Sequence, residues 1–173
     1  LSTAQFTPPP RAIVSFYGYG DIVADWYSKP DPFYLTQPAV TREEAFAAVG
    51  TRPLTGTSGP NQRSRFYLFA RQQGLWPELV SGWKASDPRL RDYCPVLHVS
   101  GKHPPALLLH GDEDTDVPWQ QSADMAQRLK AAGVVHEYVL FPGAGHGFDG
   151  KLDSSAAREA AERVKEFLKR WLE

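Results

Sequence analysis

Residues 105–118 have the sequence PALLLHGDEDTDVP, an apolar run followed at once by a polar turn rich in aspartate. A continuous apolar run is typical of a strand whose two faces are both covered by helices. Carboxylates follow at Asp112, Asp114 and Asp116. Open α/β sheets place ligands and catalytic groups beyond the carboxyl ends of their strands. We therefore predict a central parallel strand over 105–110, with a candidate site directly after it.

Two further strands and two helices are indicated around this segment. Residues 11–18 form a β-branched and aromatic run between prolines and glycines, and residues 136–141 form a second run. Apolar residues recur with helical spacing over 119–133 and again over 153–171, where Asp153 is a candidate cap. Strands that alternate with helices predict an α/β fold with a parallel sheet and right-handed crossovers.

Residues 21–100 differ in composition from the segments on either side. Prolines recur through them and strand signals are absent, but two helices are indicated. Residues 41–49 open with the capping-box spacing of Thr41 to Glu44. Residues 61–73 are followed by Gly74, a helix stop signal. The segment is therefore predicted to be an insertion with short helices.

We predict one partial α/β domain over residues 1–173. In it, 101–173 form the core that carries the candidate site, and 21–100 form a helical lid or cap inserted between strands. The aromatic residues of the insertion either line an apolar acyl pocket or form the small core of the insertion itself. These residues are Trp26, Tyr27, Phe33, Tyr34, Phe66, Tyr67, Trp76 and Trp83.

Three strands are few for a parallel sheet of this kind. A hydrophobic edge would stay unpaired beside the strand of residues 11–18, and native proteins normally cover such an edge because it promotes aggregation. We expect the missing strands to precede Leu1. The missing N-terminal part of the same fold is thus a predicted partner of this chain.

Composition excludes several classes of protein. With 19 basic and 20 acidic residues, the net charge of −1 provides no electrostatic reason to expect nucleic acid or a membrane surface as a partner. No apolar run reaches the roughly 18 residues of a membrane span, and the first residues lack the pattern of a signal peptide. The single cysteine, Cys94, excludes an internal disulfide, which favours a cytoplasmic location.

The aspartates after the central strand have three interpretations on residue pattern alone. They could cap the helix that begins near Trp119. They could open a calcium loop, but Val117 stands where an EF-hand has glycine and Ala123 where it has glutamate, so calcium is not predicted. The third interpretation is a catalytic acid.

A histidine in the loop after the last strand is the second candidate group. Residues 142–148 have the sequence PGAGHGF, so His146 also follows the carboxyl end of a strand. Glycines on either side free the backbone to bring the imidazole into a cleft. We expect the two loops to be neighbours, with His146 beside the aspartates.

This pattern of strand, HG-x-x-D-x-x-VP, helix, strand and G-x-GH-GF resembles the C-terminal part of the α/β-hydrolase superfamily. The resemblance is closest to its esterase, dienelactone-hydrolase and prolyl-oligopeptidase-like branches. It implies a C-terminal portion of an α/β-hydrolase parallel sheet with a helical lid insertion. It also implies that Asp114, three residues before Val117-Pro118, is the triad acid and that His146 is the base. The small-molecule substrate would be an ester or a peptide, and no cofactor is required.

The family's nucleophile is not recognisable in this chain. The serine of the family lies in a G-x-S-x-G elbow that precedes the acid and the histidine, and no such pentapeptide occurs in the 173 residues. The nearest strings are 56–59 and 99–101. We therefore expect a serine-hydrolase-family protein whose nucleophile lies outside this chain. The alternative is a non-catalytic relic or binding module of the same fold.

The remaining candidate nucleophile and metal ligands are interpreted as structural. Cys94 lies in the insertion, away from any strand-to-helix elbow, and is predicted to be a packed thiol. The other four histidines lack the spacing of a metal site and are expected to be structural or surface residues. They are His98, His103, His110 and His136.

Overall fold

The structure is a computed structural model that describes residues 8–49, 62–151 and 153–172. The chain forms two compact units. Leu1–Asp21 and Arg91–Glu173 make up the first, here called the sheet unit, and Ile22–Leu90 make up the second, the helical unit. Each unit is described by itself.

The described part of the sheet unit contains three parallel strands in the order β1-β2-β3. They are β1 (Ile13–Phe16), β2 (Ala106–Gly111) and β3 (His136–Phe141). All three strands and their parallel pairing were expected, although β1 is shorter than the predicted run. Because the strands are parallel, their carboxyl ends lie along one edge of the sheet, and the loops that follow β2 and β3 are neighbours.

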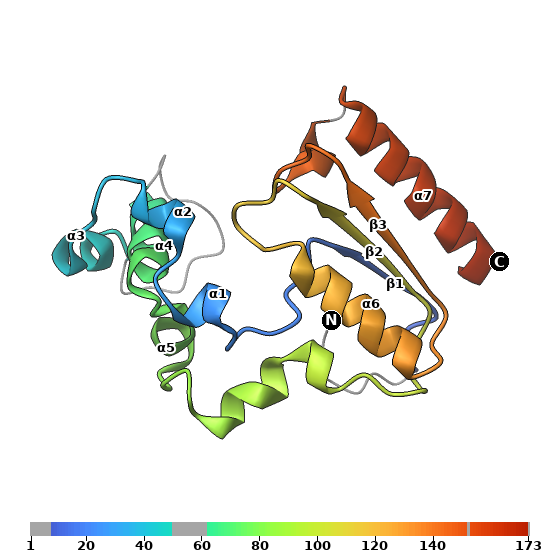
Figure 1. The fold of residues 1–173 in the computed structure, drawn as a ribbon, viewed down its shortest axis with the longest axis horizontal. Coiled ribbons are helices and arrows are strands. Elements are labelled where there is room, and N and C mark those ends of the chain that lie inside the picture. The colour runs from blue at the N-terminus through green and yellow to red at the C-terminus, as the bar shows by residue number, and fades with distance from the viewer. Residues whose placement is uncertain (1–7, 50–61, 152, 173) are drawn as a thin grey trace. The chain divides into compact units, whose positions relative to one another are not determined.

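Two helices cover the opposite faces of this sheet, α6 (Gln120–Ala131) and α7 (Ser155–Leu172) (Figure 1). Side chains alternate between the faces along β2 because the period of a strand is two residues. Leu108 packs in the cluster under α6, whereas Leu107 and Leu109 pack in the cluster under α7. The result is an α/β fold with a parallel sheet between helices, as the apolar run of β2 predicts.

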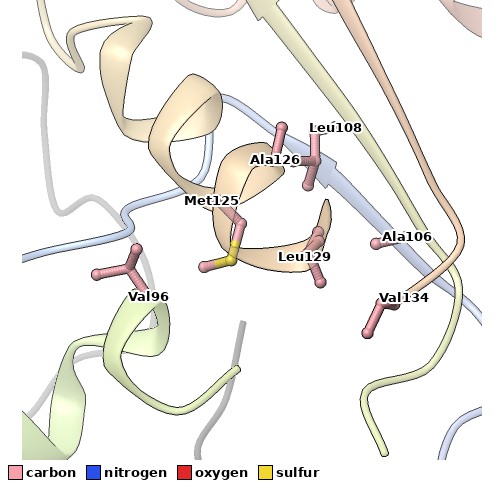
Figure 2. Close-up of a cluster of buried hydrophobic side chains, with 7 residues drawn as sticks. All are labelled: Val96, Ala106, Leu108, Met125, Ala126, Leu129 and Val134. Carbon is pink, nitrogen blue, oxygen red and sulfur yellow. The ribbon is translucent and has the colours of Figure 1, made fainter. Parts of the chain in front are cut away.

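The cluster under α6 joins three parts of the sheet unit (Figure 2). The helix contributes residues one turn apart, and Val96 comes from the short helix η2 (Pro95–Leu97). Its fully or nearly fully buried members are Val96, Ala106, Leu108, Met125, Ala126, Leu129 and Val134. This packing fixes α6 on the sheet and holds the loop that connects β2 to α6 at both ends.

The ends of α6 and α7 follow standard capping rules with one difference from prediction. Gly133 has a φ of 68° and follows the last turn of α6, as expected for a glycine stop. At the start of α7, the hydroxyl of Ser154 accepts a hydrogen bond of 3.1 Å from the backbone N–H of Ala157. The side-chain cap is therefore Ser154 and not Asp153, whose carbonyl instead accepts a hydrogen bond from Arg158.

Among its described residues, the helical unit contains five short helices and the first half of a 3₁₀ helix. They are α1 (Asp25–Ser28), α2 (Pro32–Leu35), α3 (Arg42–Ala47), α4 (Gln62–Gln73), α5 (Trp76–Ser81) and η1 (Pro88–Tyr93), which extends into the sheet unit. Both predicted helices are present as α3 and α4. Thr41 and Glu44 form the capping box, and Gly74 ends α4 with a φ of 65°.

A buried arginine lies at the centre of the helical unit. Arg71 on α4 is 1% exposed, and its guanidinium donates a hydrogen bond of 2.6 Å to Asp31 and one of 2.8 Å to the Tyr67 hydroxyl. Four aromatic rings lie within 6 Å of the guanidinium carbon: Trp26, Tyr27, Tyr34 and Tyr67. These contacts match the second interpretation of the aromatic residues, in which they form the core of the insertion.

Within the described ranges, no helix is both long enough and apolar enough to cross a membrane.

Candidate active site

The loop after β2 is held against the loop after β3 by a close backbone approach. A Cβ at Gly111 would lie 2.0 Å from the carbonyl oxygen of Ala144, so only glycine fits there. The same carbonyl accepts a hydrogen bond of 3.0 Å from the N–H of Glu113. The Asp112 carboxylate adds a second link, because it accepts a 2.7 Å hydrogen bond from the N–H of Gly143. The two loops that carry the sequence-predicted residues are therefore joined directly.

The side chain of Asp114 is fully buried and accepts hydrogen bonds on both carboxylate oxygens. Oδ1 accepts from the backbone N–H groups of Asp116 and Val117, each at 2.8 Å. Oδ2 lies 2.9 Å from Nδ1 of His146 and 3.3 Å from Nε2 of His110. The carboxylate thus orders its own turn, and no side chain caps α6 at Trp119. Asp114 therefore does not cap α6, so the capping interpretation of these aspartates does not apply to it.

His146 faces Asp114 with one ring nitrogen and turns the other away from it. The side chain is 35% exposed, while that of Asp114 is fully buried. Gly143 and Gly147 have φ values of 69° and 71°, which only glycine adopts without strain. Nε2 lies 3.6 Å from a carboxylate oxygen of Asp116, beyond hydrogen-bonding distance. The structure therefore brings the two predicted site residues together, with Nδ1 engaged by Asp114.

The hydrogen bonds around Asp114 decide its charge. Burial raises the pKa of the Asp114 carboxyl, but hydrogen bonds from His110, from the N–H of Val117, from His146 and from the N–H of Asp116 outweigh burial. The pKa of Asp114 consequently lies below its ordinary value. The group is a carboxylate at neutral pH and a strong acceptor for the His146 Nδ1–H.

His110 is a structural residue, the first of the two alternatives predicted for it, and it supports the turn that carries Asp114. Its side chain is fully buried on the α6 side of β2, with Nδ1 2.7 Å from the Ser122 hydroxyl and Nε2 2.9 Å from the Val117 carbonyl. A carbonyl only accepts, so Nε2 carries a hydrogen. The imidazole braces the turn that holds Asp114. The only sequence signal for such a role is a polar residue near the end of an otherwise apolar, buried strand.

Tyr17 is a site residue for which the sequence carries no clear signal. It directly follows β1, and its ring centroid lies 4.2 Å from that of His146. Its hydroxyl donates a hydrogen bond of 2.8 Å to Asp149, in the short helix η3 (Phe148–Gly150). Burial, together with Asp149, raises the pKa of Tyr17 to about 12, so the phenol stays protonated at neutral pH.

The other sequence candidates lie in ordinary structural positions. Cys94 is fully buried, and its thiol donates to an Asp21 carboxylate oxygen at 3.3 Å. Three histidines place one ring nitrogen within 3 Å of a backbone carbonyl oxygen: His98, His103 and His136. Among the residues that the structure describes, no three His, Cys, Asp or Glu side chains gather as a metal site.

The structure describes one of the two serine-containing strings nearest to a nucleophile motif. Residues 56–59 lie outside the described residues. Ser100 is exposed in the loop before β2, where its carbonyl accepts a hydrogen bond from His103.

A parallel sheet between helices, with an Asp–His pair beyond the carboxyl ends of adjacent strands, places the protein in the α/β-hydrolase superfamily. Within that superfamily, the chain belongs to the prolyl oligopeptidase family, whose model matches residues 35–173. The resemblance of its loop motifs to this superfamily is thereby confirmed.

Individual relatives match shorter segments. Esterase LipC of Mycobacterium tuberculosis is 37% identical over 79 residues, which are 45% of this chain and 19% of the esterase. Esterase LipQ of the same organism is 36% identical over 75 residues, which are 43% of this chain and 18% of LipQ. The matched segments are thus less than a fifth of the length of either relative.

A solved structure supports the fold over nearly the whole chain. A Staphylococcus aureus protein of unknown function superposes with a TM-score of 0.71 and 18% sequence identity. The match covers 92% of this chain and 56% of that protein. At this identity the likeness concerns the fold alone.

Proposed function

We propose that Asp114 and His146 are the acid and the general base of a Ser-His-Asp triad in a serine hydrolase. The observation that carries the proposal is the 2.9 Å contact between Nδ1 of His146 and a carboxylate oxygen of the buried Asp114. The nucleophilic serine would come from a segment outside these 173 residues, because no G-x-S-x-G elbow occurs within them.

The proposed chemistry follows from which ring nitrogen is engaged. Asp114 accepts the Nδ1–H of His146 and so keeps the lone pair on Nε2, where a serine hydroxyl can be deprotonated. The serine oxygen attacks the substrate carbonyl, and His146 then returns the proton to the leaving group. Asp114 stabilises the imidazolium formed in between. Its depressed pKa keeps it ionised for this role.

Carboxylic esters are the proposed substrate class, with peptides as the second candidate. Two relatives similar to this chain over part of its length are named esterases. Peptides are the second candidate because the chain matches the prolyl oligopeptidase family. We further propose that the helical unit, which lies between β1 and β2 in the chain, is the lid that selects the substrate.

Probe labelling tests the proposal in two forms of the protein. The chain alone should not react with a fluorophosphonate, because it lacks the elbow serine. A longer form, in which a segment containing G-x-S-x-G precedes this chain, should be labelled and should hydrolyse p-nitrophenyl esters faster than peptide anilides. In that form, Asp114→Asn and His146→Ala should each lower kcat by about 10⁴-fold.

Matched variants separate this role from general damage. Asp124→Asn on the exposed side of α6 and His98→Ala are expected to leave kcat nearly unchanged. Stoichiometric labelling of a serine within the 173 residues would contradict the assignment of the nucleophile. A longer form that is neither labelled nor active would support the alternative, a non-catalytic relic or binding module.

A further inference from the structure

We propose that Tyr17 is a positioning residue that holds the His146 imidazole against Asp114. Its ring lies against the imidazole, and its hydroxyl holds the segment that follows His146 in the chain. The consequence for hydrolysis rests on the proposed function, whereas the geometric role can be tested on this chain alone.

The backbone of Tyr17 is the first observation. With a φ of 37°, it is the only non-glycine residue with a positive φ among those that the structure describes. A bulky aromatic residue rarely adopts this conformation, because its Cβ crowds the backbone. Strained residues of this kind cluster at functional sites, where surrounding contacts hold them in place. Here the N–H of Tyr17 donates a hydrogen bond of 2.8 Å to the Leu109 carbonyl.

The unusual backbone directs the ring towards the site. The Tyr17 and His146 rings have centroids 4.2 Å apart and planes inclined by 52°. The ring also meets Phe148 edge-on at 6.2 Å and His110 at 6.5 Å. Tyr17 thus lies beside both histidines that contact Asp114, His110 and His146. It also lies beside Phe148, the first residue of η3. A side chain in this position restricts rotation of the His146 ring away from Asp114.

The hydroxyl adds a second constraint on the same loop. It donates to Asp149, three residues after His146, so the ring and the hydroxyl of one residue contact both sides of the turn at Gly147. Because the phenol stays protonated far above neutral pH, this donor is present throughout the range in which hydrolases work. Asp114 thus holds Nδ1 of the imidazole, and Tyr17 limits the movement of the ring.

The test measures the His146 tautomer in the full chain of 173 residues. Histidine is labelled with ¹⁵N, and the Nδ1 and Nε2 shifts are recorded at mildly alkaline pH, where a free imidazole is neutral. The Nδ1–H form should dominate in the unchanged protein. Tyr17→Ala should cause loss of this preference and faster exchange of the Nδ1 proton. Tyr17→Phe, which keeps the ring, should retain the preference.

Two further variants keep the result interpretable. Tyr138→Ala removes another half-buried tyrosine from the sheet unit, one that packs on the α6 side, and should leave the His146 shifts unchanged. Tyr17→Leu retains apolar volume without a ring and replaces Tyr17→Ala if that variant does not fold. It should also lose the preference for the Nδ1–H form of His146. Wild-type His146 shifts in a folded Tyr17→Ala or Tyr17→Leu protein would overturn the proposal.

Activity in the longer form separates this inference from the proposed function. There, Tyr17→Ala should lower kcat by about 10²-fold, the scale for a misplaced catalytic group, and Tyr17→Phe should recover most of the loss. If Asp114→Asn and His146→Ala have no effect on kcat, the proposed function fails, and the tautomer result still decides the role of Tyr17. An unchanged kcat in Tyr17→Ala beside an inactive His146→Ala would overturn Tyr17 alone.

Discussion

The sheet unit and the helical unit bury their cores by different means. In the sheet unit, alternate residues of β2 fill two apolar clusters, one under each covering helix. Among the described residues of the helical unit, the largest fully buried side chain is a charged one, Arg71, and aromatic rings surround it. One core depends on apolar periodicity and the other on a small number of specific polar contacts.

This difference determines how each unit should respond to substitution. An apolar cluster spreads its stabilisation over many contacts, whereas a buried ion pair concentrates it on two groups. Asp31 carries two tasks, because its carboxylate accepts from Arg71 and also caps α2 by accepting from the N–H groups of Phe33 and Tyr34. The helical unit should therefore be the more sensitive of the two to loss of a single charge.

The largest effect is expected from Arg71→Ala. Removing the guanidinium leaves the Asp31 carboxylate, whose side chain is 12% exposed, without its cationic partner. Breaking such a pair by deleting one partner costs about 3–5 kcal/mol of folding free energy. Hydrogen exchange followed by mass spectrometry should show lost protection in α4 and α2, with β2 and β3 protected as before.

A double variant sharpens this prediction. In Arg71→Met with Asp31→Asn, no uncompensated charge remains, and the Asn oxygen can still cap α2. Most of the lost protection in the helical unit should return. Equal loss of protection in β2 and the helical unit after Arg71→Ala would break the comparison, because it would make the two units one cooperative structure.

A second, somewhat smaller effect is expected from Leu109→Ala in the sheet unit. Leu109 is fully buried in the cluster under α7. Truncating a leucine in a packed core costs about 2–5 kcal/mol, depending on how far the cavity collapses. Denaturant unfolding followed by circular dichroism should report the loss, and hydrogen exchange should place it in the strands. Leu172→Ala, at a half-exposed position on α7, is the matched control and should change stability little.

The same difference explains what could be predicted from the sequence. The strands, α6, α7 and the stop at Gly133 follow from apolar periodicity and glycine, which act locally. The pairing of Asp114 with His146 follows from parallel strands that end at one edge. The sequence pattern does not decide whether the aromatic residues of the insertion line a pocket or form its core. It gives no indication that Arg71 is buried among them.

Contacts that depend on unusual local geometry were not predictable. Nothing in the run of residues 11–18 signals that Tyr17 would take a positive φ and turn its ring towards His146. The contacts of His110 with Ser122 on α6 and with the Val117 carbonyl are likewise not predictable, because the path of the turn between β2 and α6 is not evident from the sequence. The predicted cap of α7, Asp153, is wrong by one residue, since Asp153 and Ser154 are both good capping residues and the structure uses Ser154.

The smallest effect concerns acid stability. The Asp114 pKa is lower in the folded protein than in the unfolded chain, so the stability from its ionised form is fully present above its ordinary pKa and declines as the pH falls through the folded value. Burial opposes the hydrogen bonds, which makes this contribution smaller than those of the two cores. Both units contain such carboxyls, because Glu44 at its capping box and Asp87 beside Arg89 also have lowered pKa values.

Asp114→Asn isolates the contribution of the sheet unit. Unfolding midpoints measured from neutral pH down to about pH 3 should fall less steeply in Asp114→Asn than in the unchanged protein, because the amide does not titrate. Hydrogen exchange should place the altered slope in the turn after β2 and leave the helical unit with its own acid dependence. Asp124→Asn, on the exposed side of α6, is the matched control. An identical slope in Asp114→Asn would mean that its hydrogen bonds do not favour the ionised form, and the electrostatic account of the site would fail with it.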